Sequence, residues 1–188
     1  MFRTEGLGND PMKKRISLGL FFAVFILLHV YVKLWTKPAF ESAGEKVGQP
    51  AAPFERTTLQ GDPLQLAAIA RTRKLVILNF WESWCGPCQM EMPDLQKLYA
   101  AHQNQGVILI GIYGSSSDDS VKKIIQERSL TFPMVRDLDG ALSKAYGVNA
   151  VPSTFVIGPD LKILRSREGI DMGLQTFVEE RLGREARQ

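Results

Sequence analysis

The sequence NFWESWCGPCQMEMP, residues 79–93, contains both cysteines of the chain, Cys85 and Cys88. The apolar run KLVILNF (74–80) leads into it and is rich in residues that favour β-structure, which predicts a buried central strand. A helix is predicted at 87–103, because the proline between the cysteines suits a first helical turn. We therefore expect the two cysteines where a buried strand ends and a helix begins.

Two of the three interpretations of the cysteine pair fit the sequence poorly. A structural zinc site needs four ligands, whereas the chain offers these two cysteines and two histidines, His29 and His102, the first within an apolar segment. A purely structural disulfide would close a very short loop, which the chain-entropy model values at about 2 kcal/mol, against about 5 kcal/mol for a loop of about 100 residues. We expect neither a metal site nor a stabilising cross-link.

A redox-active pair agrees with the local chemistry. The first turn of a helix carries unpaired N–H groups and a partial positive charge, which favour a thiolate over a thiol. Cys85 is expected to be the exposed thiol that attacks a substrate disulfide. Cys88, one turn into the helix, is expected to be the buried thiol that resolves the mixed disulfide. No cofactor is expected beyond the Cys85–Cys88 disulfide itself.

Strands and helices alternate through the rest of the domain. A second buried strand is predicted at 107–113, after Gly106 ends the preceding helix. The other predicted elements are two short strands within 54–66, a helix with Val121, Ile124 and Ile125 on one face, a strand at 132–136, a helix at 141–146, a hairpin over 153–168, and a last helix with Leu174, Phe177, Val178 and Leu182 on one face. This order predicts an α/β domain with a mixed sheet and helices on both faces.

The N-terminal part of the chain predicts a membrane anchor. Residues 16–32 carry no charge and would span roughly 26 Å as a helix, to which Leu34 and Trp35 add length. Four lysines or arginines precede the stretch and two follow it closely, which favours an N-terminus in the cytoplasm. The alternatives are a buried core helix or a cleaved signal peptide, whose best cleavage site, at 42–44, lies far downstream of the apolar run.

The expected organisation has four parts. They are a basic cytoplasmic segment at 1–15, a transmembrane anchor at 16–36, a linker at 37–52 and a domain at 53–188. The linker mixes proline, glycine, alanine and charges without periodicity. The bias of basic residues would place everything after the anchor outside the cytoplasm.

Composition narrows the classes of function. The chain has 188 residues, of which 45% are hydrophobic and 23% charged, as in a globular protein. Its formal net charge is +3, and no basic patch is interleaved with aromatic residues. Nucleic acid is therefore not an expected partner.

The motifs resemble those of a known family. FWESWCGPC is similar to the active-site sequence of thioredoxins, including the proline five residues after the second cysteine, Pro93. The wider pattern resembles the membrane-anchored TlpA/ResA-like thioredoxins, with APFERTTLQGDPLQL upstream and FPMVRDLDGALSKAYGV and VPSTFVI downstream. The resemblance runs from about residue 47 to the C-terminus. It implies a thioredoxin fold with an N-terminal β-hairpin extension and a central strand–helix insertion, outside the cytoplasmic membrane of a bacterium.

The resemblance also implies roles for the residues that react and bind. Cys85 matches the nucleophile of the family and Cys88 its resolving thiol. Pro152 matches the cis-proline opposite the pair, and Val151 before it would offer its backbone to a bound substrate segment.

Residues around the first cysteine are expected to contact the substrate. Trp84 would flank the exposed sulfur, and Gly86 and Pro87 would complete the contact surface. Trp81, by contrast, is expected to pack in the core.

One departure from ordinary thioredoxins concerns proton transfer. Where they carry a buried aspartate, this chain has Asn79, which cannot exchange protons. Glu91 matches the acidic residue of the family's CxxE pattern and lies one helical turn from Cys88. We expect Glu91 to handle protons for the pair, the alternative being a solvated helix glutamate.

The expected function is a membrane-tethered thiol-disulfide oxidoreductase that reduces disulfides of client proteins. In the family such activity serves cytochrome c maturation or copper-site assembly, and electrons come from a membrane-embedded thiol donor. The alternatives are a net oxidant or isomerase, and a non-enzymatic copper-handling or holding module. A peroxiredoxin does not fit, because its nucleophile follows a threonine three residues earlier and here that position is Glu82.

Overall fold

The structure is a computed structural model that describes residues 24–28 and 46–185. The chain divides into two units, Met1–Phe40 and Glu41–Gln188. In the first unit, residues 24–28 form a helical turn with exposed side chains. Among the described residues, no helix has both the length and the apolar character needed to cross a membrane. The predicted cytoplasmic segment, most of the predicted anchor at 16–36 and the first part of the predicted linker lie outside the described residues.

The second unit is built on a mixed sheet with the strand order β5-β4-β3-β6-β7. Its strands are β3 (Leu75–Phe80), β4 (Val107–Tyr113), β5 (Met134–Arg136), β6 (Ser153–Ile157) and β7 (Ile163–Glu168). The first three are parallel to one another, so their carboxyl ends meet at one edge. β6 pairs antiparallel with β3, and β7 pairs antiparallel with β6. β3 lies at the centre and all its residues are buried, as the apolar run predicted.

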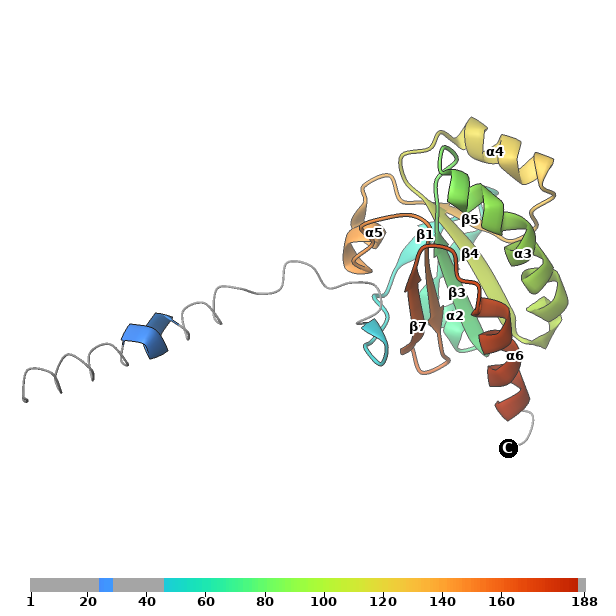
Figure 1. Ribbon diagram of the computed structural model, residues 1–188. Helices are drawn as coiled ribbons and strands as arrows, with labels where there is room; N and C mark the ends of the chain where they lie inside the picture. Colours follow the sequence, from blue (N-terminus) through green and yellow to red (C-terminus); the bar gives the residue numbers. More distant parts are fainter. Residues whose placement is uncertain (1–23, 29–45, 186–188) are drawn as a thin grey trace, which may run out of the picture. The chain divides into compact units, whose positions relative to one another are not determined.

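Helices cover both faces of this sheet (Figure 1). The helices α3 (Gly86–His102), α4 (Asp118–Glu127) and α6 (Leu174–Glu185) pack on one face, and the short helices α2 (Leu66–Ala70) and α5 (Ala141–Ala145) pack on the other. A 3₁₀ turn, η2 (Gln103–Gln105), extends α3. It ends at Gly106, whose φ of 96° is accessible to glycine but costly for other residues. The predicted fold class, a thioredoxin-like α/β domain with flanking helices, is confirmed.

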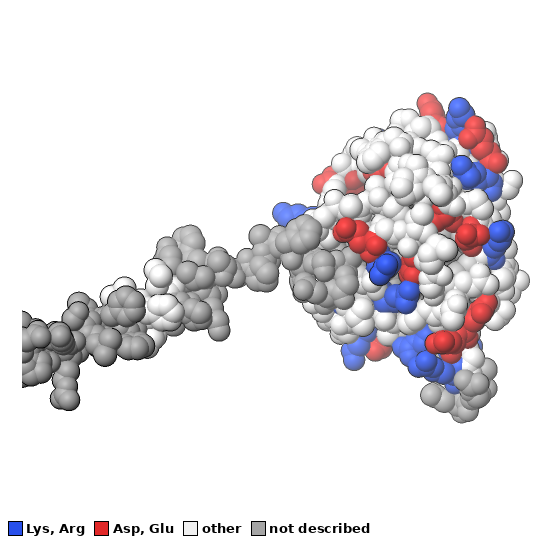
Figure 2. Space-filling model, viewed as in Figure 1, with Lys and Arg blue, Asp and Glu red and all other residues white. Residues whose placement is uncertain are grey.

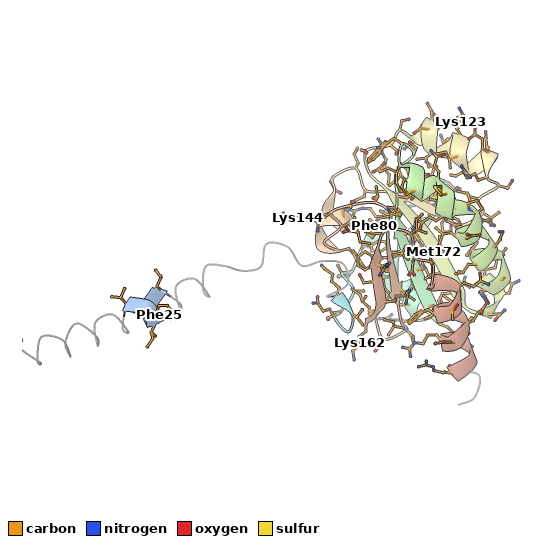
Figure 3. All side chains as sticks on the ribbon, in the orientation of Figure 1. Phe25, Phe80, Lys123, Lys144, Lys162 and Met172 are labelled. Atoms are coloured by element: carbon orange, nitrogen blue, oxygen red, sulfur yellow. A yellow bond between two sulfur atoms is a disulfide. The ribbon has the colours of Figure 1, made fainter. Side chains whose placement is uncertain are left out.

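Successive side chains of β3 point to opposite faces of the sheet, so the core forms two layers. Leu75 and Ile77 pack in the cluster that contains α3, α4 and α6, whereas Val76 and Leu78 pack in the cluster that contains α2 and α5. In the second cluster the ring of Phe80 packs against the rings of Tyr146 and Phe155, and the ring centroids are 5.7 Å apart in each pair. Figure 3 shows Phe80 inside the folded unit and Lys123, Lys144 and Lys162 at its periphery.

A hairpin and an inserted strand extend the sheet. β1 (Glu55–Thr57) and β2 (Pro63–Gln65) form a two-stranded antiparallel ladder, and Thr58 bridges to Val135 of β5. β5 and α5 lie between β4 and β6 along the chain. β1 and β2 form the expected N-terminal hairpin, and β5 and α5 are a strand and a helix in the central part of the chain, where the insertion was expected. The sequence interpretation missed the one-turn helix α2.

The folded unit begins earlier than the predicted boundary between residues 52 and 53. Within the predicted linker, the Gly48 N–H donates to the Ile163 carbonyl at 2.7 Å, and the Ala51 N–H donates to the Leu161 carbonyl at 2.7 Å. Ala51 is buried. This segment was predicted as a linker because its sequence lacks periodicity. Backbone hydrogen bonds to the start of β7 hold it nevertheless, because such bonds do not depend on the pattern of side chains.

Charges of both signs are interspersed on the face shown in Figure 2.

Candidate active site

Cys85 and Cys88 form a disulfide at the amino end of α3. Cys85 is the N-cap residue and follows β3 by a short loop, so the pair lies at the edge where the parallel strands end. The Cα atoms of the two cysteines are 5.3 Å apart. The Cys88 N–H donates to Cys85 Sγ at 3.2 Å. After reduction, this N–H and the helix dipole would both favour a thiolate on Cys85.

The two sulfurs differ in exposure, though less than the sequence predicted. Cys85 is 5% exposed and Cys88 is 0% exposed. The expectation of an exposed Cys85 is therefore wrong for the disulfide form, although Cys85 is the more accessible of the two. Part of the cover comes from the Val151 carbonyl, which lies 3.6 Å from Cys85 Sγ.

The loop before β6 faces the disulfide through a cis peptide bond. Val151–Pro152 is cis, as the family resemblance implied. Pro152 is buried and Val151 is half-buried. The loop thus brings the backbone of Val151 next to the sulfur of Cys85.

Exposed side chains surround the disulfide on the helix side. Gly86 and Pro87 are both exposed, and Trp84 is 68% exposed. The indole N–H of Trp84 donates to Ser115 Oγ at 3.0 Å, which ties the ring to the loop after β4. Trp81 is fully buried, as predicted.

Packing around Trp81 explains a glycine on β4. A Cβ at Gly111 would collide with Met134 and with the indole nitrogen of Trp81. Trp81 therefore lies against bare backbone beneath the active-site loop.

Glu91 is buried on the inner face of α3, one turn beyond Cys88. Its side chain accepts a hydrogen bond from Asn79 Nδ2 at 2.8 Å, and the same nitrogen donates to Thr154 Oγ1 at 3.1 Å. Burial raises the pKa of Glu91 to about 7; the Asn79 hydrogen bond and the backbone of Asp171 oppose this rise, and the Asp171 charge adds to it. The alternative of a solvated helix glutamate is wrong.

A cavity of about 230 Å³ opens beside Glu91. It lies between α3 and the segment that leads into α6, and its polar walls include Asp94, Asp171 and Gln175. Asn79 Oδ1 is buried and has no hydrogen-bond partner among the described residues. Glu91 thus joins a polar cluster, from Asn79 to Asp171, that the motif alone did not reveal.

Glu82 is a second buried carboxylate, for which the sequence predicted no role. It accepts hydrogen bonds from the backbone N–H groups of Gly114 at 2.9 Å, Ser115 at 2.8 Å and Ser116 at 2.8 Å, and a further one from the Ser116 hydroxyl. Burial by itself would raise the pKa of Glu82, but these donors together lower it. A sequence signal existed in hindsight: the acid follows β3 and the GSSS turn follows the adjacent parallel strand.

The loop that carries Glu82 makes further contacts with the turn after β4. The Ser83 N–H donates to Ser116 Oγ at 2.7 Å, and Ser83 Oγ lies 2.9 Å from Ser120 Oγ on α4. Gln89 Nε2 donates to the Ser83 carbonyl at 2.6 Å. The residues that precede Cys85 are therefore fixed from both sides.

Within the described part of the chain, no group of three or more His, Cys, Asp and Glu side chains could hold a metal ion. His102 lies at the other end of α3 from the cysteines.

Comparison with known proteins agrees with this geometry. Residues 47–166 match the model of the AhpC/TSA family. The chain belongs to this family. Within it, the thiol-disulfide oxidoreductase ResA of Bacillus thuringiensis subsp. konkukian is 35% identical over 124 residues, which cover 66% of this chain and 70% of ResA. The sporulation thiol-disulfide oxidoreductase A of Bacillus subtilis is 33% identical over 153 residues, covering 76% and 89% of the two chains.

A solved structure supports the same assignment. The crystal structure of StoA from Bacillus subtilis superposes with a TM-score of 0.59 at 29% identity, covering 70% of this chain and 96% of StoA. This member of the AhpC/TSA family is a thiol-disulfide oxidoreductase of the ResA/StoA type.

Proposed function

We propose that the protein is a membrane-tethered reductant that opens disulfides of client proteins outside the cytoplasm. The observation that supports this most directly is the Cys85–Cys88 disulfide at the start of α3, with the Cys88 N–H directed at Cys85 Sγ and the cis-proline loop opposite. Gly86 and Pro87 between the cysteines are the residues that thioredoxins carry, and they favour a reductant.

The reaction proceeds in two exchanges. The Cys85 thiolate attacks one sulfur of a client disulfide, which forms a mixed disulfide and releases a client thiolate that takes up a proton. Cys88 then loses its proton and attacks Cys85 Sγ, which forms the Cys85–Cys88 disulfide and releases the second client thiolate. The second client thiolate also takes up a proton. Two electrons pass from the protein to the client; one proton originates on Cys88 and the other comes from solvent, because Cys85 reacts as a thiolate. A thiol donor later restores the dithiol.

We assign to Glu91 the role of accepting the proton of Cys88. A thiolate is costly at the buried Cys88, so the resolving step needs a base close by. Glu91, with its raised pKa, is a stronger base than an exposed glutamate, and Asn79 holds its carboxylate in place. Val151 and Pro152 would align the client backbone, with Trp84, Gly86 and Pro87 forming the rest of the contact surface.

The cellular setting is part of the proposal. A single anchor at 16–36 would hold the domain on the periplasmic or extracytoplasmic side of a bacterial cytoplasmic membrane. Electrons would come from a membrane-embedded thiol donor. The clients would be proteins of cytochrome c maturation or of copper-site assembly.

A redox titration tests the direction of electron flow. The full-length protein is equilibrated in thiol–disulfide buffers and its free thiols are trapped. We expect a potential near that of thioredoxin, about −270 mV, rather than near that of protein disulfide isomerase, about −180 mV. A value at or above about −180 mV would support a net oxidant or isomerase instead. Loss of client reduction in Cys85→Ser, with an otherwise unchanged fold, separates enzymatic reduction from mere holding.

Cell fractionation tests the tether. The protein should remain in the membrane fraction at full length, with its cysteines accessible from outside the cytoplasm. A soluble form that begins near residue 45 would contradict the anchor.

A further inference from the structure

Two carboxylates line the cavity beside the active site from opposite sides. Glu91 comes from α3, and Asp171 comes from the segment between β7 and α6. The Asp171 side chain is only 3% exposed. Its negative charge raises the pKa of Glu91. Two largely buried acids that line one cavity cannot both ionise freely unless a cation offsets one of them.

Arg165 supplies that cation to Asp171 alone. Its Nε donates to Asp171 Oδ2 and its Nη2 to Asp171 Oδ1, each at 2.6 Å, in a bidentate pair. The guanidinium carbon also lies 5.3 Å from the ring centroid of Phe177 on α6. A Cβ at Gly173 would come within 2.9 Å of Arg165 Nη2, so the glycine leaves room for the guanidinium.

We propose that Asp171, paired with Arg165, is a positioning residue that determines when Glu91 holds a proton. The Asp171 carboxylate lines the same cavity as Glu91, and its charge lets Glu91 bind a proton more readily than it would alone. Arg165 limits this effect by neutralising part of the charge. In client reduction, Glu91 as a stronger base would take the Cys88 proton more readily; this consequence rests on the proposed function.

Other groups around Glu91 do not replace Asp171 in this role. Asn79 on β3 and Thr154 on β6 hydrogen-bond near the carboxylate but carry no charge. Asp94, on the same helix, is largely exposed and pairs with Lys97 at 3.1 Å, so solvent screens it. The cysteine sulfurs face the site from the amino end of α3, and they do not titrate while the disulfide is intact.

The decisive measurement uses the oxidised protein, in which only carboxyl groups titrate near Glu91. The full-length chain in a mild detergent, labelled with ¹³C at its glutamate carboxyls, gives the protonation midpoint of Glu91 by NMR, with Glu91→Gln assigning the signal. We expect Asp171→Asn to lower the midpoint by about one pH unit. Arg165→Gln should raise it, and Arg165→Lys should lie between Arg165→Gln and the wild type.

Asp139→Asn is the matched control. Asp139 also pairs with an arginine, Arg56, at 3.3 Å, but it follows β5 at the opposite edge of the sheet. This variant should leave the Glu91 midpoint unchanged. A midpoint in Asp171→Asn equal to that of the wild type would overturn the proposal and leave the Arg165–Asp171 pair as a link between β7 and α6. If Asp171→Asn does not fold, the absence of an upward shift in Arg165→Gln overturns it.

Exchange kinetics separate this inference from the proposed function. The rate of client-disulfide reduction is measured against pH for the wild type, for Asp171→Asn, and for both changes made in a Glu91→Gln background. A shift of the NMR midpoint without any change in the rate profile would uphold the positioning role and reject Glu91 as the base in exchange. A rate profile that shifts equally in the Glu91→Gln background would show that Asp171 acts on the thiols directly, which contradicts the inference.

Discussion

Two glutamates on either side of the disulfide meet opposite environments. Glu82 precedes Cys85 and Glu91 follows Cys88, and they are 8% and 6% exposed. Glu82 accepts four hydrogen bonds from the turn after β4, and its pKa is lowered despite burial. Glu91 accepts one side-chain hydrogen bond, from Asn79, faces the Asp171 charge, and its pKa is raised to about 7.

This difference shows that burial alone does not determine whether an acid is charged. Donors that converge on a carboxylate can outweigh desolvation, and a nearby negative charge adds to it. Glu82 therefore stays ionised near neutral pH and organises the loop carrying Trp84 and Cys85. Glu91 is left close to the point where it gains or loses a proton near neutral pH.

The largest effect is expected from Glu82→Ala. The change leaves three backbone N–H groups and one hydroxyl without their acceptor, so the free energy of unfolding should fall by at least about 3 kcal/mol. Chemical denaturation of the oxidised protein measures this. Glu127→Ala, on the exposed face of α4, is the control and should cost less than about 0.5 kcal/mol. Similar losses in the two variants would mean that Glu82 does not organise the loop.

At high pH, Glu91→Gln should raise the free energy of unfolding, whereas Glu82→Ala should lower it. In the wild type, folding keeps a proton on Glu91 that the unfolded chain releases above pH 4.5, so stability falls as the pH rises from about 4.5 to about 7. Glutamine carries no such penalty. The variant should therefore match the wild type below about pH 4.5 and exceed it at pH 8 by up to about 3 kcal/mol.

The stability of Glu82→Gln relative to the wild type should depend on pH differently from that of Glu91→Gln. Because its folded pKa is lowered, Glu82 contributes stability above its unfolded pKa and loses it as the pH falls through the lowered value. The variant should be less stable than the wild type at pH 8, by about 1–3 kcal/mol, and the gap should narrow in acid. Denaturation curves across pH 3 to 8 check this. A gap that widens in acid would contradict the lowered pKa.

The two cysteines should differ in reactivity, and Glu91 should tune that difference. In the reduced protein a mild alkylating agent should modify Cys85 before Cys88, since Cys88 is fully buried. Glu91→Gln removes a nearby negative charge, so alkylation of Cys85 should reach its midpoint about half a pH unit lower. Glu127→Gln should leave the midpoint in place. Faster labelling of Cys88 would show that the attacking thiol is misassigned.

The smallest effect is expected from Ser115→Ala. It removes the acceptor of the Trp84 indole N–H, an exposed hydrogen bond, and should cost about 0.5 kcal/mol or less. The steady-state anisotropy of Trp84 fluorescence, measured with Trp35 and Trp81 replaced by phenylalanine, should fall as the ring gains freedom. Unchanged anisotropy would mean that packing alone holds Trp84.

Local patterns predicted most of the fold. The apolar run before the cysteines forms β3, the proline after Cys85 opens α3, and the apolar stripe of the last helix buries Leu174, Val178 and Leu182. These features follow from periodicity and turn chemistry, which neighbouring residues encode. The cis form of Pro152 followed from family resemblance rather than from local chemistry.

The site was predicted only in part, because its electrostatics depend on residues distant in sequence. Glu91 was chosen from its spacing to Cys88, but its charge state depends on Asn79, twelve residues earlier, and on Asp171, eighty residues later. Glu82 meets its donors only where β3 and β4 end side by side. The exposure of Cys85 was overestimated because Val151 approaches it across the sheet.

The sequence by itself thus determined the elements of the domain and the two reacting cysteines, because helices, strands and the helix N-terminus follow from residues close along the chain. Only the tertiary structure decided which acid stays ionised and which holds a proton. A carboxylate's charge depends on the donors, charges and solvent within a few ångströms of it, and around this disulfide most of these neighbours come from other strands and loops.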